Sequence, residues 1–478
     1  MIGTAAVAPT LVAHGLAVQV QDLPLPLHVF YWGAAAALAV SFGLLAFGAH
    51  RIAPGKLVKR PDWEAAAATD LDESPPASLA WSIIAGGLGL FWLALTIATA
   101  LFGSLEGAGN PSPNLVFVLG WIGIPVAAVV LGRAALRLHG PLALARLGGI
   151  GERSNTPPPR ALGVWLAWAG LVVFVWLELV YPTASHVRLL GWLVLGWTFF
   201  VVAAASRWGA GAVREHIDPF ATYARVISAL SPWWRNSNGR LRLRVPLLGA
   251  NQDLGTEQYG FPMFATFLIG SVSFDGLTRT DWWQTRVSLA TANLDHHGIS
   301  PDNARVAFGT FGLVVMLTLA YCLFEAAAWG SARIGRFDRG PHARMRAAAL
   351  FAPSLIPIAL AYVVAHYFSF FVVQVQDLAR YASDPFDRGW DLFHTSTLKI
   401  ADLWIPTGTT VWLVEVFAIV TGHIAGLLLA HDRALECVER HADGKPNAAR
   451  ATLSQLPMLA LMLTYTVAGL YFLSEGLR

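Results

Sequence analysis

Residues 80–103 read AWSIIAGGLGLFWLALTIATALFG, a stretch in which no residue carries a charged side chain. The hydrocarbon core of a bilayer is about 30 Å thick, and an α-helix needs roughly 20 apolar residues to cross it. The stretch is therefore long and apolar enough to form one transmembrane helix. Further runs of the same kind lie on both sides of it, and the polar residues are concentrated between them.

We predict an all-α fold, a polytopic bundle of about ten transmembrane helices. The sixth predicted span is the shortest, and Pro262, Gly270 and Asp275 in its run favour a broken or re-entrant helix as the alternative. The predicted spans cover residues 28–49, 80–103, 113–133, 161–181, 187–206, 258–275, 306–330, 347–373, 408–430 and 453–473.

The composition supports one continuous membrane domain over residues 28–478 rather than several soluble domains. Of the 478 residues, 55% are hydrophobic and 13% charged, whereas soluble domains average about 25% charged residues. Residues 1–27 are expected to be an exterior leader, with cleavage before His14 as an alternative, and residues 207–259 a cytoplasmic insertion. The apolar composition predicts a lipid bilayer as partner. The net charge of +3, with no basic block, predicts no nucleic-acid partner.

The distribution of Lys and Arg predicts the orientation. The alternate loops at 50–79, 133–160, 207–259, 331–346 and 431–451 hold 25 of the 33 basic residues. Cytoplasmic loops carry an excess of Lys and Arg, so these loops are assigned to the cytoplasm. Both termini are then outside, in a multi-pass protein of the plasma membrane.

Placing an ionisable side chain inside a span costs free energy, roughly 2.5–3.5 kcal/mol for a charge at the centre of the span. The presence of such a residue therefore requires an explanation. In the eighth span, the helical rotation between His366 and Asp377 places their side chains about 20° apart around the helix axis. The two residues therefore share one helix face. The ninth span carries Glu415 near the same exterior mouth and His423 about two turns deeper. Together the four residues favour a site that opens to the exterior.

The exterior loop after the sixth span adds Asp295, His296 and His297. Adjacent histidines are able to reach one ion, and His with carboxylate suits a divalent transition metal such as zinc, copper, iron or manganese. We expect His366, His423, Asp295, His296 and His297 to bind the metal, and Asp377 or Glu415 to act as general base. The alternative is that each polar group only hydrogen-bonds a neighbouring helix or, in the loop, water.

Four segments resemble bacterial multi-spanning proteins named fenitrothion hydrolases, found widely in actinobacteria. These segments are HGLAVQVQDLPLP (14–26), NQDLGTEQYGFP (251–262), AHYFSFFVVQVQD (365–377) and GHIAGLLLAHDRAL (422–435). The resemblance implies hydrolysis of an organophosphate triester, a small apolar substrate. It also implies a hetero-oligomer with a related partner chain.

The residues are compatible with a hydrolase in which a metal lowers the pKa of a bound water and a carboxylate receives its proton. Two other functions remain open. A transporter or metal-handling protein would use the same His and carboxylate groups as a transit site. A structural membrane subunit would use them only to pack helices.

The orientation is tested by reporter fusions. We expect fusions after residues 140 and 340 to report cytoplasm, and fusions after 295 and 390 to report the exterior, because of the bias in basic residues. An exterior signal at 340 would reverse the orientation of the C-terminal half.

Overall fold

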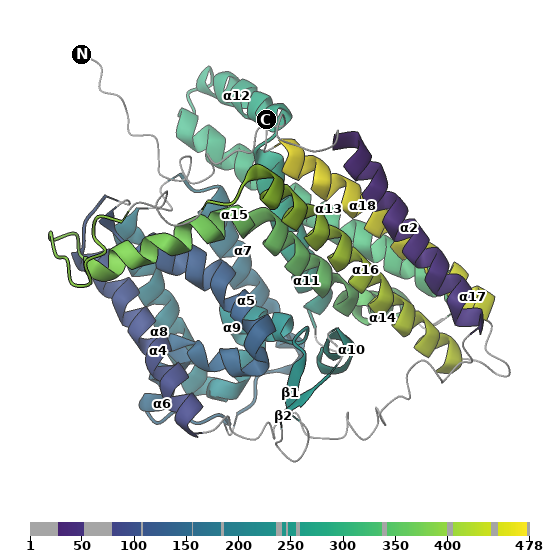
Figure 1. Ribbon diagram of the computed structural model, residues 1–478, viewed down its shortest axis with the longest axis horizontal. Coiled ribbons are helices and arrows are strands. Elements are labelled where there is room, and N and C mark those ends of the chain that lie inside the picture. Colours follow the sequence, from purple (N-terminus) through teal and green to yellow (C-terminus); the bar gives the residue numbers. More distant parts are fainter. Residues whose placement is uncertain are drawn as a thin grey trace.

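The computed structural model describes residues 27–51, 79–106, 109–154, 156–182, 186–235, 241–244, 247–254, 259–336, 342–398, 405–440 and 448–475. These residues form helices, their connections and one short hairpin (Figure 1). The predicted all-α fold is therefore confirmed. The expected leader at residues 1–27 lies outside the described residues except for Leu27, the first residue of a helix.

The first helix, α2 (Leu27–Arg51), packs against the C-terminal helices (Figure 1). The rest of the N-terminal half builds a group of helices around α5 and α9. Its elements are α4 (Leu79–Phe102), the π-helix η3 (Asn114–Gly123), α5 (Ile124–Leu131), η4 (Gly132–Leu138), α6 (Gly140–Leu147), η5 (Arg160–Leu162), α7 (Trp165–Leu179), α8 (Val187–Ala212), η6 (Val213–Ile217) and α9 (Pro219–Ser228).

The C-terminal half packs beside this group, and its last helix lies against α2 (Figure 1). Its elements are β1 (Trp233–Arg235), β2 (Leu241–Leu243), α10 (Leu248–Asp253), α11 (Phe261–Thr278), α12 (Asp281–Asp295), α13 (Pro301–Gly335), α14 (Ala343–Phe351), η7 (Ala352–Leu355), α15 (Ile356–Ser383), α16 (Gly408–Arg440), α17 (Ala448–Leu453) and α18 (Leu456–Glu475).

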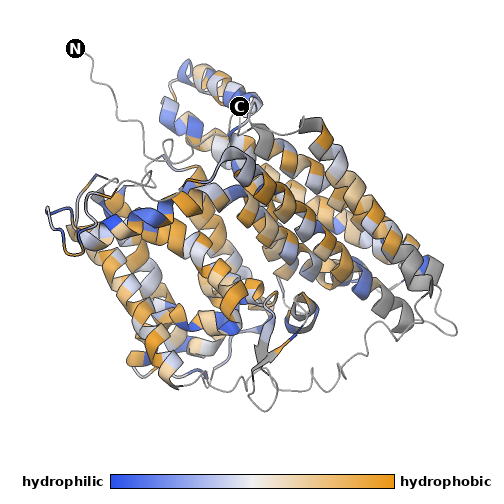
Figure 2. Cartoon of the chain, viewed as in Figure 1, coloured by the Kyte–Doolittle hydropathy of each residue, from blue (hydrophilic) through white to orange (hydrophobic). Residues whose placement is uncertain are grey.

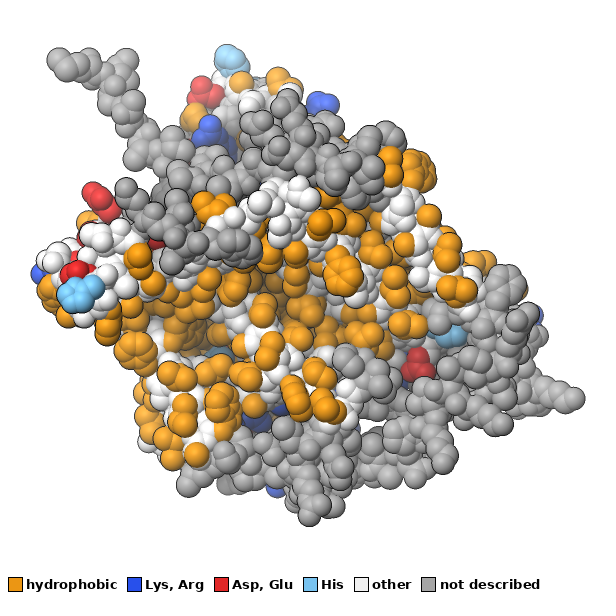
Figure 3. Space-filling view, viewed as in Figure 1, with side chains coloured by type: hydrophobic (Ala, Val, Ile, Leu, Met, Phe, Trp, Pro, Cys, Tyr) orange, Lys and Arg blue, Asp and Glu red, His pale blue; other side chains and the backbone are white. Residues whose placement is uncertain are grey.

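Eight helical stretches of the described chain are long and apolar enough to cross a membrane. They coincide with predicted spans two to nine, and the shorter apolar helices Trp32–Leu44 and Leu456–Phe472 fall within the first and last spans. Hydrophobic residues run along most of these helices and cover the visible face of the bundle (Figures 2 and 3). The chain is a multi-pass membrane protein.

The sixth span is one unbroken helix, α11, most of whose residues are buried. Pro262 lies in its first turn, where a missing N–H breaks no helical hydrogen bond. Gly270 faces α13, because a Cβ added there would lie 3.1 Å from the Leu317 side chain and 3.2 Å from Ala320 Cβ. Of the three residues that favoured a break, Pro262 thus starts the helix, Gly270 allows close packing, and Asp275 lies buried within the helix.

The segment expected to be a cytoplasmic insertion contains α9, all of whose residues are buried or nearly so. Asp218 caps this helix by accepting a hydrogen bond from the Ala221 N–H at 2.6 Å. The helix packs against α5 and α7. Part of residues 207–259 therefore belongs to the core of the bundle.

Helices α15 and α16 approach closely through two glycines on α16. A Cβ at Gly422 would overlap the Ala361 Cβ and lie 2.8 Å from the Pro357 carbonyl oxygen. A Cβ at Gly426 would lie 2.7 Å from the Ser354 carbonyl oxygen. Glycines four residues apart let membrane helices pack closely where no hydrophobic effect drives them together.

We expect Gly422→Leu to lower the free energy of unfolding by about 1–3 kcal/mol, because the side chain must displace backbone of α15 and η7. Thermal unfolding of the detergent-purified protein measures this. The matched control is Gly87→Leu on α4, where an added Cβ meets nothing within 4 Å. Equal loss in both variants would contradict the close packing.

Candidate functional site

A charged cluster joins α11 and α15 inside the bundle. The His366 Nε2 atom lies 2.5 Å from Asp275 Oδ2 and 2.9 Å from an Nη atom of Arg279. The same Arg279 nitrogen contacts Asp275 at 3.2 Å. The side chains of Asp275 and His366 are 8% and 4% exposed and that of Arg279 is 27% exposed, so the carboxylate and the imidazole are shielded from water.

The His366 Nε2 atom lies between an acceptor and a donor. When it carries a proton it donates to Asp275 Oδ2, and when it carries the lone pair it accepts from Arg279. Tyr367 also donates its hydroxyl to Asp275 Oδ2, at 3.3 Å. Asp275 is therefore the acceptor at the centre of the cluster.

Local sequence positions these groups. Asp275 and Arg279 are four residues apart at the end of α11, a spacing that places both on one helix face. His366 and Tyr367 are consecutive on α15, and their rings meet edge to face at 4.8 Å between centroids. Packing of α11 against α15 brings the two pairs together.

Two further carboxyl groups interact electrostatically with this cluster. Glu178, at the end of α7, interacts with the charges of Asp275 and Arg279. Glu415, near the start of α16, interacts with Arg279 and is 6% exposed. Ionisable groups from four helices therefore surround one guanidinium.

Among the buried polar atoms of α16 for which the described residues provide no hydrogen-bond partner are Glu415 Oε2 and His423 Nε2. His423 is fully buried, and its Nδ1–H donates to the Ile419 carbonyl oxygen at 2.8 Å. The Nε2 atom therefore keeps its lone pair. Leaving a buried polar atom unsatisfied costs about 1–3 kcal/mol, which calls for an explanation beyond packing.

The other residues predicted for the site lie elsewhere. Asp377 pairs with Arg380, one turn further along α15, at 3.5 Å. Asp295, His296 and His297 are exposed at the end of α12, which projects from the bundle (Figure 1). The His297 Nδ1–H donates to the Asn293 carbonyl oxygen at 2.9 Å, within the same turn. The expectation that this loop folds over His366 is not met.

The described residues show no arrangement typical of a metal site. In the described part of the chain no three His, Cys, Asp or Glu residues are grouped as ligands. At the cluster itself the two donors Asp275 and His366 share their space with the Arg279 cation, which would repel a metal. Metal binding therefore stays a prediction, and the described residues do not identify a site for it.

Sequence reasoning missed the partner of His366. The predicted span boundaries place Asp275 at the end of the sixth and shortest span and Arg279 in the exterior loop after it, although both lie at the end of α11. The signal that would have found them is an acidic residue followed four positions later by a basic one at the end of an apolar run. The helix that packs against this pair is determined by the tertiary structure and cannot be read from either helix alone. The sequence therefore grouped His366 with Asp377 instead.

A separate cavity of about 480 Å³ lies among α4, α7, α8 and α9, and its walls are almost entirely apolar. Figure 3 shows the hydrophobic face hollowed in the region of these helices. His139 at its edge donates from Nε2 to Asp218 at 3.0 Å and accepts the Leu142 N–H at Nδ1. Both ring nitrogens are occupied, so His139 holds the structure together and offers no base.

Comparison with known proteins identifies no relative: no family model, curated protein or solved structure matches the chain. The resemblance to fenitrothion hydrolases is neither supported nor opposed by that result. The arguments about function therefore depend on the residues themselves.

We expect Asp275→Ala to lower the free energy of unfolding by about 1–3 kcal/mol, because it removes the buried carboxylate that accepts hydrogen bonds from Arg279 and Tyr367. The double variant Asp275→Ala with Arg279→Ala should recover part of that loss. Thermal or denaturant unfolding in detergent measures both. The exposed pair Asp302 and Arg305, 3.9 Å apart, provides a control double-mutant cycle. There each substitution should change the free energy of unfolding by no more than about 0.5 kcal/mol.

Proposed function

We propose that this protein is a transporter of the plasma membrane that couples solute movement to protons, with Asp275 and His366 as its protonation site. The observation that supports the proposal is the Asp275–Arg279–His366 cluster, in which Asp275 and His366 are buried within membrane spans and Arg279 lies at the end of one. Ionisable groups that face the interior of a membrane bundle mark proton relays and ion pathways.

The balance of charge explains how the site would work. Asp275 and Arg279 neutralise each other while His366 is neutral. Uptake of one proton by the Asp275–His366 pair gives the three residues a net charge of +1. The carboxyl groups of Glu178 and Glu415 also interact electrostatically with Arg279.

Helix α16 supplies the next acceptor. His423 is eight residues beyond Glu415, about 12 Å deeper along the helix, and its Nε2 lone pair is unused among the described residues. A proton released from the outer cluster toward the opposite side would find a base there. This arrangement explains why two costly unsatisfied atoms occur on one helix.

Hydrolysis of an organophosphate triester is the second candidate, and the apolar cavity favours it. A volume of about 480 Å³ falls in the range of sites for small ligands, and a neutral triester suits apolar walls. The polar side chains of the walls are already engaged, since both nitrogens of His139 are hydrogen-bonded and Thr96 donates its hydroxyl to the Trp92 carbonyl oxygen. A catalytic residue would have to come from elsewhere, for example from a related partner chain.

In proteoliposomes with an imposed membrane potential, we expect proton uptake that an entrapped pH-sensitive dye records. His366→Ala and Asp275→Asn should each slow it by roughly 10²-fold, the lower end of the usual scale for removing a proton-transfer group. The control is Asp302→Asn, an exposed carboxylate on α13.

The same preparation separates the two candidates. Turnover of an aryl dialkyl phosphorothioate without proton uptake would replace transport by hydrolysis as the proposed function. Proton uptake that is unchanged in both cluster variants would remove Asp275 and His366 from the mechanism.

A further inference from the structure

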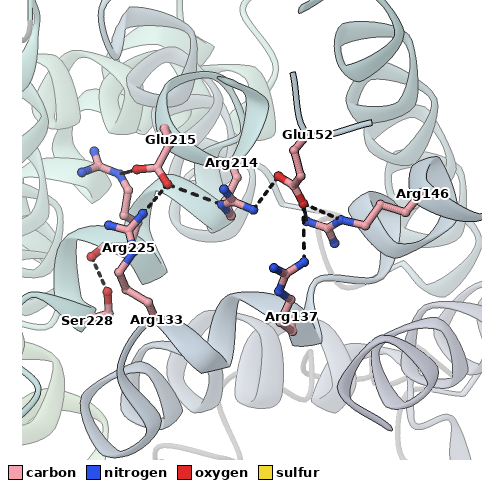
Figure 4. A network of polar contacts seen from close by, with 8 residues as sticks. All are labelled: Arg133, Arg137, Arg146, Glu152, Arg214, Glu215, Arg225 and Ser228. Carbon is pink, nitrogen blue, oxygen red and sulfur yellow. Dashed lines mark hydrogen bonds and ion pairs between the residues drawn. The ribbon is translucent and has the colours of Figure 1, made fainter. Parts of the chain in front are cut away.

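Five arginines and two glutamates form a network at the helix ends that the orientation assigns to the cytoplasm (Figure 4). Glu152 contacts Arg137, Arg146 and Arg214 at 3.4, 2.9 and 2.9 Å. Glu215 contacts Arg133, Arg214 and Arg225 at 2.5, 3.4 and 3.3 Å. Arg214 belongs to both groups, so they form one arginine cluster.

A kink in α8 positions the centre of this cluster. Gly209 has a φ of 83°, which a side chain would strain, and the helix bends there. The N–H groups of Ala210 and Gly211 donate to the carbonyl oxygens of Gly151 and Glu152 at 3.0 and 2.9 Å. The loop that carries Glu152 is thereby fixed against η6, which carries Arg214.

The arginine cluster has an excess of positive charge. Five guanidinium groups against two carboxylates leave a net charge of +3. Five arginines offer up to about 25 N–H donors, whereas two carboxylates accept about eight hydrogen bonds. The carboxylates therefore order the arginines without saturating them.

The carboxylates remain ionised at neutral pH. Burial acts to raise the pKa of Glu152, but the charges of Arg214, Arg146 and Arg137 outweigh it and hold that pKa below its usual value. The net charge of +3 therefore persists at neutral pH. Protonation of Glu152 in acid would increase the charge further.

Exposed hydrophobic side chains flank the cluster. Leu144 and Leu147 on α6 are 42% and 74% exposed, and Leu147 is the neighbour of Arg146. Leu131, just before η4, is 38% exposed. Arg133 and Arg137 are themselves 35% and 26% exposed, so part of the cluster is accessible at the surface.

We propose that the arginine cluster binds the phosphate of an anionic phospholipid, whose acyl chains lie against Leu144 and Leu147. Guanidinium groups match phosphate oxygens in pairs, and basic sites between membrane helices select anionic headgroups. The flanking leucines favour a lipid over free phosphate, which has no apolar part. The proposal is independent of the proposed transport function.

The experiment compares lipid binding to the full-length, detergent-purified protein by native mass spectrometry, with phosphatidylglycerol and phosphatidylcholine as probes. We expect selective binding of phosphatidylglycerol. Arg133→Ala with Arg137→Ala should weaken it about 25-fold, or about fivefold for each arginine. Each glutamate keeps two arginine partners in this variant, so the fold is retained.

A control and an opposite variant sharpen the test. Arg286→Ala with Arg305→Ala removes two arginines from the α12–α13 region and should leave binding unchanged. Glu152→Gln adds one net positive charge and should tighten binding about fivefold. Equal binding of both lipids, or no change in the Arg133 and Arg137 variant, would overturn the proposal. Inorganic phosphate that competes as tightly as the lipid would show an anion site and overturn the lipid assignment.

Discussion

Backbone hydrogen bonding in hydrocarbon is the constraint on which the whole arrangement depends. No water reaches the lipid-facing N–H and C=O groups, so each span satisfies them internally as a helix. Helices made this way gain little from further burial of apolar side chains, because lipid is equally apolar. Their positions are therefore decided by close approach at small residues, such as Gly422 and Gly426 against α15, and by a few polar contacts.

The same constraint explains how much of the fold could be predicted from the sequence. A run such as residues 80–103 specifies a span by its length and lack of charge, and the eight long apolar stretches coincide with predicted spans. Pro262 and Gly270 were ambiguous, because a proline in a first turn and a glycine at a helix contact resemble helix breakers when only their identity is known. Helix α9 was missed because a short capped helix leaves no run of that length.

The candidate site was predicted only in part, for a physical reason. His366, Glu415 and His423 were recognised by the cost of burying an ionisable group, a property of each residue and its span. Their partners depend on which helices touch. His366 meets Asp275 because α11 packs against α15, and no periodicity within either helix encodes that contact. The histidines at the end of α12 looked equally suitable in sequence but are exposed.

The two charged clusters differ in the property that decides what each can bind. In the Asp275–Arg279–His366 group the carboxylate and the imidazole are buried and the charges are close to balanced, which suits the uptake of a proton. The arginine cluster is partly exposed and has a surplus of three positive charges, which suits the binding of an anion. Loss of charge balance should therefore disrupt folding at the first cluster but only change ligand affinity at the second.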